Sequence, residues 1–152
     1  MGADVDTNEA SAVDSDSKSL LVFAIDSQFF AINAASVVSV IGWREPVALP
    51  GSHSTIRGVI QDRGRVVVVI EHPLAGGATA VSTSETPARI LICDTVQGYV
   101  GIPATHTFSI EAHVSAVAVE DGALIEMRRG PVFIVDADVV AERAAGVQEG
   151  AL

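Results

Sequence analysis

The side chains that could bind a metal in this sequence are few and scattered. Histidine occurs four times, and Cys93 is the single cysteine. A zinc site needs three or four ligands at compatible spacings, and the sequence contains no His-Glu-x-x-His motif and no cysteine pair. We therefore expect no metal site, a buried and unreactive Cys93, and unpatterned surface histidines at His53, His72, His106 and His113.

Motifs for covalent or nucleotide chemistry are also absent from the sequence. There is no Gly-x-Ser-x-Gly, no phosphate-binding Gly-x-x-x-x-Gly-Lys and no Gly-x-Gly-x-x-Gly. Asp136 and Asp138 stand at a predicted helix start, where capping explains them better than acid–base catalysis. One alternative is a small metal- or ligand-binding β-barrel enzyme using Glu71, His72 and His106, but no spacing brings these groups together. The sequence favours a protein that is not an enzyme and needs no cofactor.

Arg63 is the residue best suited to bind another protein. It follows Asp62 in the polar break 61–64 between two apolar runs, so its guanidinium can project from a turn. A planar guanidinium suits carboxylates or backbone carbonyls of a partner helix. From these residues alone, the simpler interpretation is a solvated arginine or one paired with Asp62.

Apolar residues that could line a binding groove precede this turn. Val37, Val38 and Val40 could receive an apolar stripe of a partner helix. From the residues alone a place in the core is the favoured interpretation, and some of them must be core in either case, because successive side chains of an extended segment point to opposite faces. Trp43 is either an interface anchor or a lid over the end of a barrel. The sequence leaves these alternatives open.

Short valine-rich runs predict the elements that position these residues. Turn residues separate the runs, which indicates an all-β fold of two small SH3-like five-stranded barrels packed together, with a short C-terminal helix over 136–143. We expect the glycine-rich break near residue 76 to divide the strands into two groups. The predicted strands are 20–25, 29–32, 38–43, 56–60, 65–70, 89–94, 99–102, 114–119, 123–127 and 132–135, with Asn33 capping a helical turn over 34–38.

The formal net charge of −10 bears on partners and on domain organisation. Residues 1–18 hold five carboxylates against Lys18 alone, which predicts a disordered acidic tail. The domain should span 19–143, with its internal connection near 72–88 and a flexible C-terminus over 144–152. Acidic surfaces repel nucleic acid and anionic lipid, and no apolar run is long enough to span a bilayer. We expect a cytoplasmic protein that binds no nucleic acid and does not insert into membranes.

Between residues 21 and 72, a series of motifs matches a known family without a gap. The motifs are Leu21-Val22-Phe23, Phe30-Ala31-Ile32, Val37, Val40, Leu49-Pro50, Ile56-Arg57-Gly58-Val59, Arg63-Gly64 and the apolar run 66–70. This segment resembles the first half of CheW-like coupling domains. Two later segments, Tyr99-Val100-Gly101-Ile102 and Pro131-Val132-Phe133-Ile134-Val135, resemble the later strands of that family more loosely.

The resemblance implies two five-stranded barrels with a groove between them, and a scaffold without catalytic residues or cofactor. That family couples the cytoplasmic tips of chemoreceptors to a histidine autokinase. Arg63 matches the turn arginine of its receptor-facing surface, Val37 matches an apolar position of the same groove, and two glycines match those that shape the strands and the turn. The candidate partner-binding residues are therefore Arg63, Val37, Val40, Gly58, Gly64, Asp62 and Trp43.

The sequence also departs from the family pattern. Gln61-Asp62 replaces Asn-Leu, Val68 stands where proline is usual, Glu71-His72 replaces Asp-Leu, and His53 replaces a common proline. The stretch 102–123 is short for the family, which predicts a trimmed second subdomain. Two functions therefore stay open: an adaptor that binds receptor and kinase, or a receptor-binding modulator that has lost kinase binding.

Overall fold

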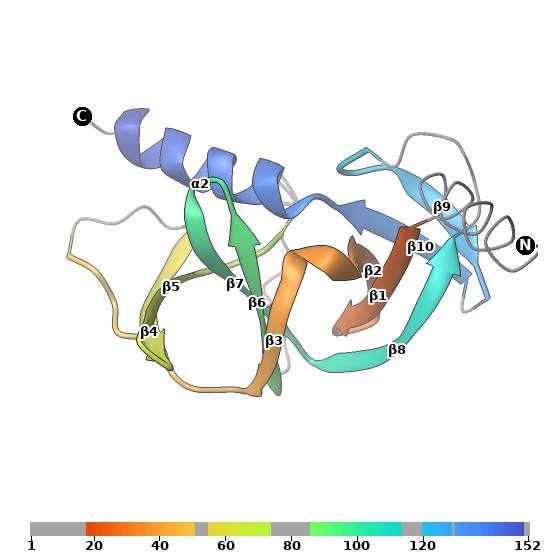
Figure 1. Cartoon of the computed structure of the whole chain (residues 1–152), viewed down its shortest axis with the longest axis horizontal. Helices are drawn as coiled ribbons and strands as arrows, with labels where there is room; N and C mark the ends of the chain where they lie inside the picture. The colour runs from red at the N-terminus through yellow and green to blue at the C-terminus, as the bar shows by residue number, and fades with distance from the viewer. Residues whose placement is uncertain (1–17, 51–54, 74–85, 114–119, 129, 151–152) are drawn as a thin grey trace, which may run out of the picture.

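The computed structural model describes residues 18–50, 55–73, 86–113, 120–128 and 130–150. These residues form ten strands, one short 3-10 turn and one α-helix (Figure 1). The elements are β1 (Lys18–Ile25), β2 (Gln28–Asn33), η1 (Ala34–Ser36), β3 (Val37–Gly42), β4 (Ile56–Asp62), β5 (Arg65–Ile70), β6 (Arg89–Thr95), β7 (Gly98–Ala104), β8 (His106–His113), β9 (Leu124–Met127), β10 (Gly130–Val135) and α2 (Ala137–Gly150).

The strands form two five-stranded sheets, with α2 running from the end of β10 across the second sheet (Figure 1). Sheet A has the order β8-β1-β2-β10-β9, and sheet B has the order β3-β6-β7-β5-β4. The predicted all-β fold with a C-terminal helix is confirmed. The predicted division of strands near residue 76 is wrong, because that position falls between β5 and β6, inside sheet B. Sheet A instead joins both ends of the chain through the parallel pairing of β2 with β10.

Three apolar clusters hold the sheets together. A central core lies between the sheets and includes Phe23, stacked on Phe30 with ring centroids 5.4 Å apart. Sheet A curls over a cluster that includes Val22 and Ile134, and sheet B over one that includes Ile60. Complete burial of one such side chain contributes about 1.5–3 kcal/mol. Each sheet therefore has its own core and also shares the central one.

The segment after β3 hooks back onto β4 at the edge of sheet B. Val47 and Val59 exchange two backbone hydrogen bonds, each 2.9 Å long. This bridge joins the segment after β3 to β4, and no ladder between the described residues of β3 and β4 closes sheet B, so the predicted barrels are two packed sheets and not closed strand barrels. Gly58 permits the close approach, because a Cβ there would lie 2.3 Å from the Val47 carbonyl oxygen.

The predicted helix caps are confirmed, but the helix is longer than predicted. The Ala35 N–H donates to Asn33 Oδ1 at 3.0 Å, which caps η1. The Asp138 N–H donates to Asp136 Oδ1 at 2.9 Å, which caps α2. The helix continues to Gly150, so the predicted flexible C-terminus is corrected for 144–150. Packing on the central core accounts for the helix as far as Ala144, because its buried face repeats at helical spacing through Ala137, Val140, Ala141 and Ala144.

Strand β8 was not predicted, although the sequence contained a signal for it. Phe108, Ile110 and Ala112 alternate with polar residues, as in a half-buried strand. The strand predicted over 114–119 and the tail over 1–17 lie outside the described residues, while Lys18 belongs to β1. Both sheets hold five strands, so the short stretch after β7 has not removed a strand from either. Within the described residues, no helix is long and apolar enough to cross a membrane.

Candidate protein-binding site

The turn between β4 and β5 is tighter than the sequence predicted. Asp62 pairs with Arg65, so the two strands extend further and leave only Arg63 and Gly64 in the turn. Both turn residues have positive φ, 53° at Arg63 and 79° at Gly64. Two successive positive φ values are those of a type I′ turn, whose twist matches that of paired strands. The hairpin therefore ends in a defined turn with Arg63 at its tip.

Arg63 occupies an unfavourable backbone conformation and keeps its guanidinium free. A residue with a Cβ loses about 1–2 kcal/mol in the left-handed region, and arginine has no short side chain to compensate locally. The residue is exposed, and among the described residues its side chain makes no hydrogen bond or ion pair. The guanidinium is thus available to an incoming carboxylate or carbonyl group.

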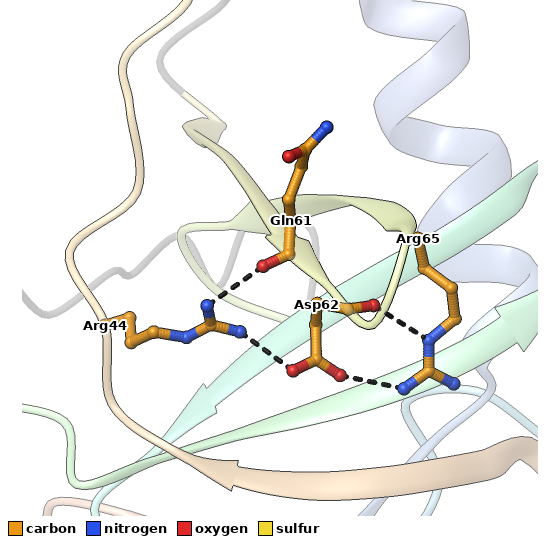
Figure 2. A network of polar contacts seen from close by, with 4 residues as sticks. All are labelled: Arg44, Gln61, Asp62 and Arg65. Carbon is orange, nitrogen blue, oxygen red and sulfur yellow. Dashed lines mark hydrogen bonds and ion pairs between the residues drawn. The ribbon is translucent and has the colours of Figure 1, made fainter.

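Asp62 is used inside the hairpin and does not pair with Arg63. Its two carboxylate oxygens accept from Arg44 Nη2 at 3.0 Å and from Arg65 Nη2 at 2.8 Å (Figure 2). Arg44 Nη1 also donates to the Gln61 carbonyl at 2.9 Å. These contacts attach the segment that leaves β3 to the side of the hairpin. The alternative in which Asp62 neutralises Arg63 is therefore wrong.

Trp43 lies over the core of sheet B as a lid. It is partly buried and packs against the sheet B cluster. The Arg57 guanidinium lies 5.3 Å from the centroid of the Trp43 ring, and its Nε is 3.3 Å from Glu71 Oε1. Arg65 covers the ring of Tyr99 in the same way, at 5.4 Å. Of the two alternatives left open for Trp43, this position matches the lid.

Val37 and Val40 lie on the same face of β3, but in different surroundings. A register shift between Val37 and Ser39 places Val37 opposite Cys93 and Val40 opposite Leu91, and residues paired across strands share a face. Val37 packs against the central core, whereas Val40 is 41% exposed. Val40 is therefore open to a partner, whereas Val37 is not. Val38, which stands at the register shift and is 44% exposed, is open as well.

The described structure does not unite all the predicted site residues in one place. Arg63 and Gly64 form the hairpin tip, while Gly58 is buried beneath the segment that carries Val47. The β3 valines connect to the tip through Arg44, two residues beyond the end of β3. Sequence reasoning missed the parts played by Arg44 and Arg65. No local pattern indicated Arg44, because it lies 18 residues from the aspartate it contacts. Arg65 is only three residues from Asp62, so the opposite charges on either side of the turn were a local signal for that pair.

The groups considered for metal or thiol chemistry are not assembled into a site. Burial raises the pKa of the Cys93 thiol to about 12, so it stays protonated and unreactive at neutral pH. Among the described residues, no group of three or more His, Cys, Asp or Glu side chains is placed to hold a metal ion. His53 and the side chain of His113 lie outside the described part of the chain.

Comparison with known proteins identifies one family model and a similar solved structure. A model described as a CheW-like domain matches residues 19–142. The crystal structure of the scaffolding protein TtCheW from Thermoanaerobacter tengcongensis superposes with a TM-score of 0.65. The match covers 81% of this chain and 91% of that chain at 14% sequence identity, so it bears on the fold alone. No curated protein sequence matches the chain.

Proposed function

This chain belongs to the CheW-like domain family, and we propose that it is a non-enzymatic chemosensory adaptor. It would bind the cytoplasmic tip of a chemoreceptor and couple that receptor to a histidine autokinase. The observation that carries the proposal is the family match across 19–142, combined with an exposed, unpaired Arg63 at the position of the family's turn arginine. The proposed place of work is the cytoplasm, where those receptor tips lie.

Arg63 would orient the receptor, and exposed valines would supply apolar contact. A guanidinium can donate to carboxylates and to carbonyls at a helix end, and such bonds strengthen when water is excluded. Val38 and Val40 on β3 would bury against apolar residues of the helical hairpin. Val37 would support β3 from the central core without touching the partner.

The complete pair of five-stranded sheets favours an adaptor that binds both partners. The modulator hypothesis rested on a trimmed second subdomain, and neither sheet lacks a strand. The enzyme hypothesis gains no support from the described residues, since Glu71 pairs with Arg57 and is not placed in a metal-binding group.

The test is binding of the purified chain, side by side, to a receptor cytoplasmic domain and to the kinase's regulatory domain. Isothermal titration measures both under one buffer condition. Binding to both supports the coupling adaptor. Binding to the receptor alone would replace it with the modulator, and binding to neither would contradict the proposed function.

A further inference from the structure

The surface proposed to bind a receptor is divided between the two edges of sheet B. Strands β3 and β4 are the outer strands in the order β3-β6-β7-β5-β4, and no ladder joins the described residues of one to those of the other. Val38 and Val40 lie on β3, whereas Arg63 directly follows β4. A partner that contacts both edges therefore needs them to be held in a fixed relative position.

A set of charged side chains ties these two edges together at the hairpin. Arg44, two residues beyond β3, donates through Nη2 to Asp62 Oδ1 at 3.0 Å and through Nη1 to the Gln61 carbonyl at 2.9 Å (Figure 2). The second carboxylate oxygen of Asp62 accepts from Arg65 Nη2 at 2.8 Å. We call Arg44, Asp62 and Arg65 the clasp. Its one carboxylate joins the segment after β3, the end of β4 and the start of β5.

The Asp62 carboxylate is shielded enough to fix the direction of its partners. Its side chain is 13% exposed, and the guanidinium of Arg65 also covers the ring of Tyr99. Hydrogen bonds between ionised groups are shorter and stronger than those between neutral groups. Without this carboxylate, Arg44 and Arg65 would lose the acceptor that they share. Since exposed ion pairs contribute little to net stability, the main consequence of the clasp is where the hairpin lies.

Arg63 depends on this support because the turn does not hold it by itself. Its φ is positive, and among the described residues its side chain makes no hydrogen bond or ion pair. In the turn of the first hairpin, by contrast, the Asp26 N–H donates to Thr105. Asp62 and Arg65 stand immediately before and after the two residues of the Arg63 turn. The clasp is therefore the nearest polar attachment of the Arg63 turn to the rest of sheet B.

We propose that Asp62 is a positioning residue for receptor binding, because its clasp holds Arg63 in a fixed place relative to the exposed valines of β3. This inference rests on the proposed function and deepens it, since it states how one site is assembled from two edges of a sheet. The receptor meets a preorganised surface and does not have to order the hairpin on binding. Asp62 acts through Arg63 and does not itself contact the receptor.

The sign of the change in affinity distinguishes positioning from simple charge effects. Asp62→Asn removes a negative charge beside Arg63, so charge alone would strengthen attraction to a receptor carboxylate, whereas Arg44→Gln removes a positive charge. We expect both variants to lower the affinity for a receptor cytoplasmic domain by about 3- to 10-fold, measured by isothermal titration. Glu45→Gln is the matched control, because this exposed carboxylate lies beside Arg44 and outside the clasp. It should change the affinity by less than about 2-fold.

Coupling to Arg63 distinguishes positioning from a general structural role. In an Arg63→Asn background, Asp62→Asn should change the affinity by less than about 2-fold, because no guanidinium remains to be positioned. A loosened fold, or a direct contact between Asp62 and the receptor, would instead lower the affinity equally in both backgrounds. In the free protein, backbone nitrogen relaxation should show larger motions of the Arg63 and Gly64 amides in Asp62→Asn, with those of the Asp26 turn unchanged.

The outcomes for this inference and for the proposed function are distinguishable. If the unmodified chain binds the receptor, an unchanged or increased affinity of Asp62→Asn would overturn the inference alone. An equal loss in both backgrounds, or unchanged motions at Arg63 and Gly64, would do the same. Absence of binding by the unmodified chain would overturn the proposed function and this inference with it.

Discussion

The hairpins β1–β2 and β4–β5 both reverse the chain in a tight turn, but the contacts that hold the two turns in place differ. Each has a two-residue turn, Asp26-Ser27 in the first and Arg63-Gly64 in the second. The leading residue has a positive φ in both, 55° at Asp26 and 53° at Arg63. Aspartate visits this region more readily than arginine, because its short polar side chain can bond to nearby backbone.

The rest of the protein holds the first turn and leaves the second open. The Asp26 N–H donates to Thr105 Oγ1 at 3.0 Å, and that hydroxyl donates to the Ala24 carbonyl at 2.9 Å. Around the second turn, the polar contacts of Asp62 fix the flanks (Figure 2). Arg63 at the tip is exposed. The first turn thus serves the fold, while the second presents a side chain outward.

The largest effect is expected where the second hairpin meets the segment that follows β3. Gly58→Ala places a Cβ against the Val47 carbonyl in a backbone conformation that alanine rarely adopts. We expect a loss of about 3 kcal/mol or more in the free energy of unfolding, measured by urea denaturation. Gly64→Ala is the control, because it meets open space and should cost only about 1 kcal/mol from its positive φ. Similar losses in both variants would contradict this account of Gly58.

Removing the support of the first turn should have the next largest effect. Thr105→Val keeps the side-chain shape but deprives the Asp26 N–H of its acceptor and the Ala24 carbonyl of a donor. We expect a loss of about 1–3 kcal/mol in unfolding free energy. Thr107→Val, on the neighbouring part of β8, serves as the control and should change stability by less than about 0.5 kcal/mol. Equal effects would mean that the first turn needs no such support.

A smaller loss is expected at the flank of the second turn. Asp62→Asn weakens both ion pairs, but the Arg44 side chain is 48% exposed and solvent screens its contribution. We expect a loss of about 1 kcal/mol or less in unfolding free energy, decreasing further in high salt. Combining it with Arg44→Ala should cost less than the sum of the single changes, since the two share one interaction. Additive losses would show that the contact contributes nothing.

The smallest effect is expected from the N-terminal segment. Deletion of residues 1–17 should change the unfolding free energy by less than about 0.5 kcal/mol, because a segment with five carboxylates and few large apolar residues can bury little apolar surface. Thermal unfolding followed by circular dichroism measures this. A clear drop in Tm would mean that the segment packs as part of the domain.

Local features of the fold could be predicted from the sequence, whereas the grouping of strands into the two sheets could not. The caps at Asn33 and Asp136 and most strands follow from residue type and from alternation over a few positions. The grouping of strands into sheets depends on contacts between distant segments, such as the parallel pairing of β2 with β10. No local pattern encodes that pairing, and this is why the division near residue 76 was wrong.

In the candidate site, too, the local features could be predicted from the sequence and the contacts between distant segments could not. An exposed Arg63 in a turn follows from its polar neighbours and the glycine after it. The pairing of Asp62 with Arg44 depends on how the segment after β3 returns to β4. Val37 is buried and Val40 is exposed because of a register shift in β3, and the residue types in that strand do not predict the shift.

The most direct test of the central claim is Arg63→Asn, measured for stability and receptor affinity in the same preparation. Asparagine accepts a positive φ, so the turn survives while the guanidinium is lost. We predict an unchanged or slightly higher Tm and a receptor affinity weakened by about 5- to 150-fold, equivalent to about 1–3 kcal/mol. Unchanged receptor affinity in the folded variant would contradict the claim that this turn exists to present Arg63.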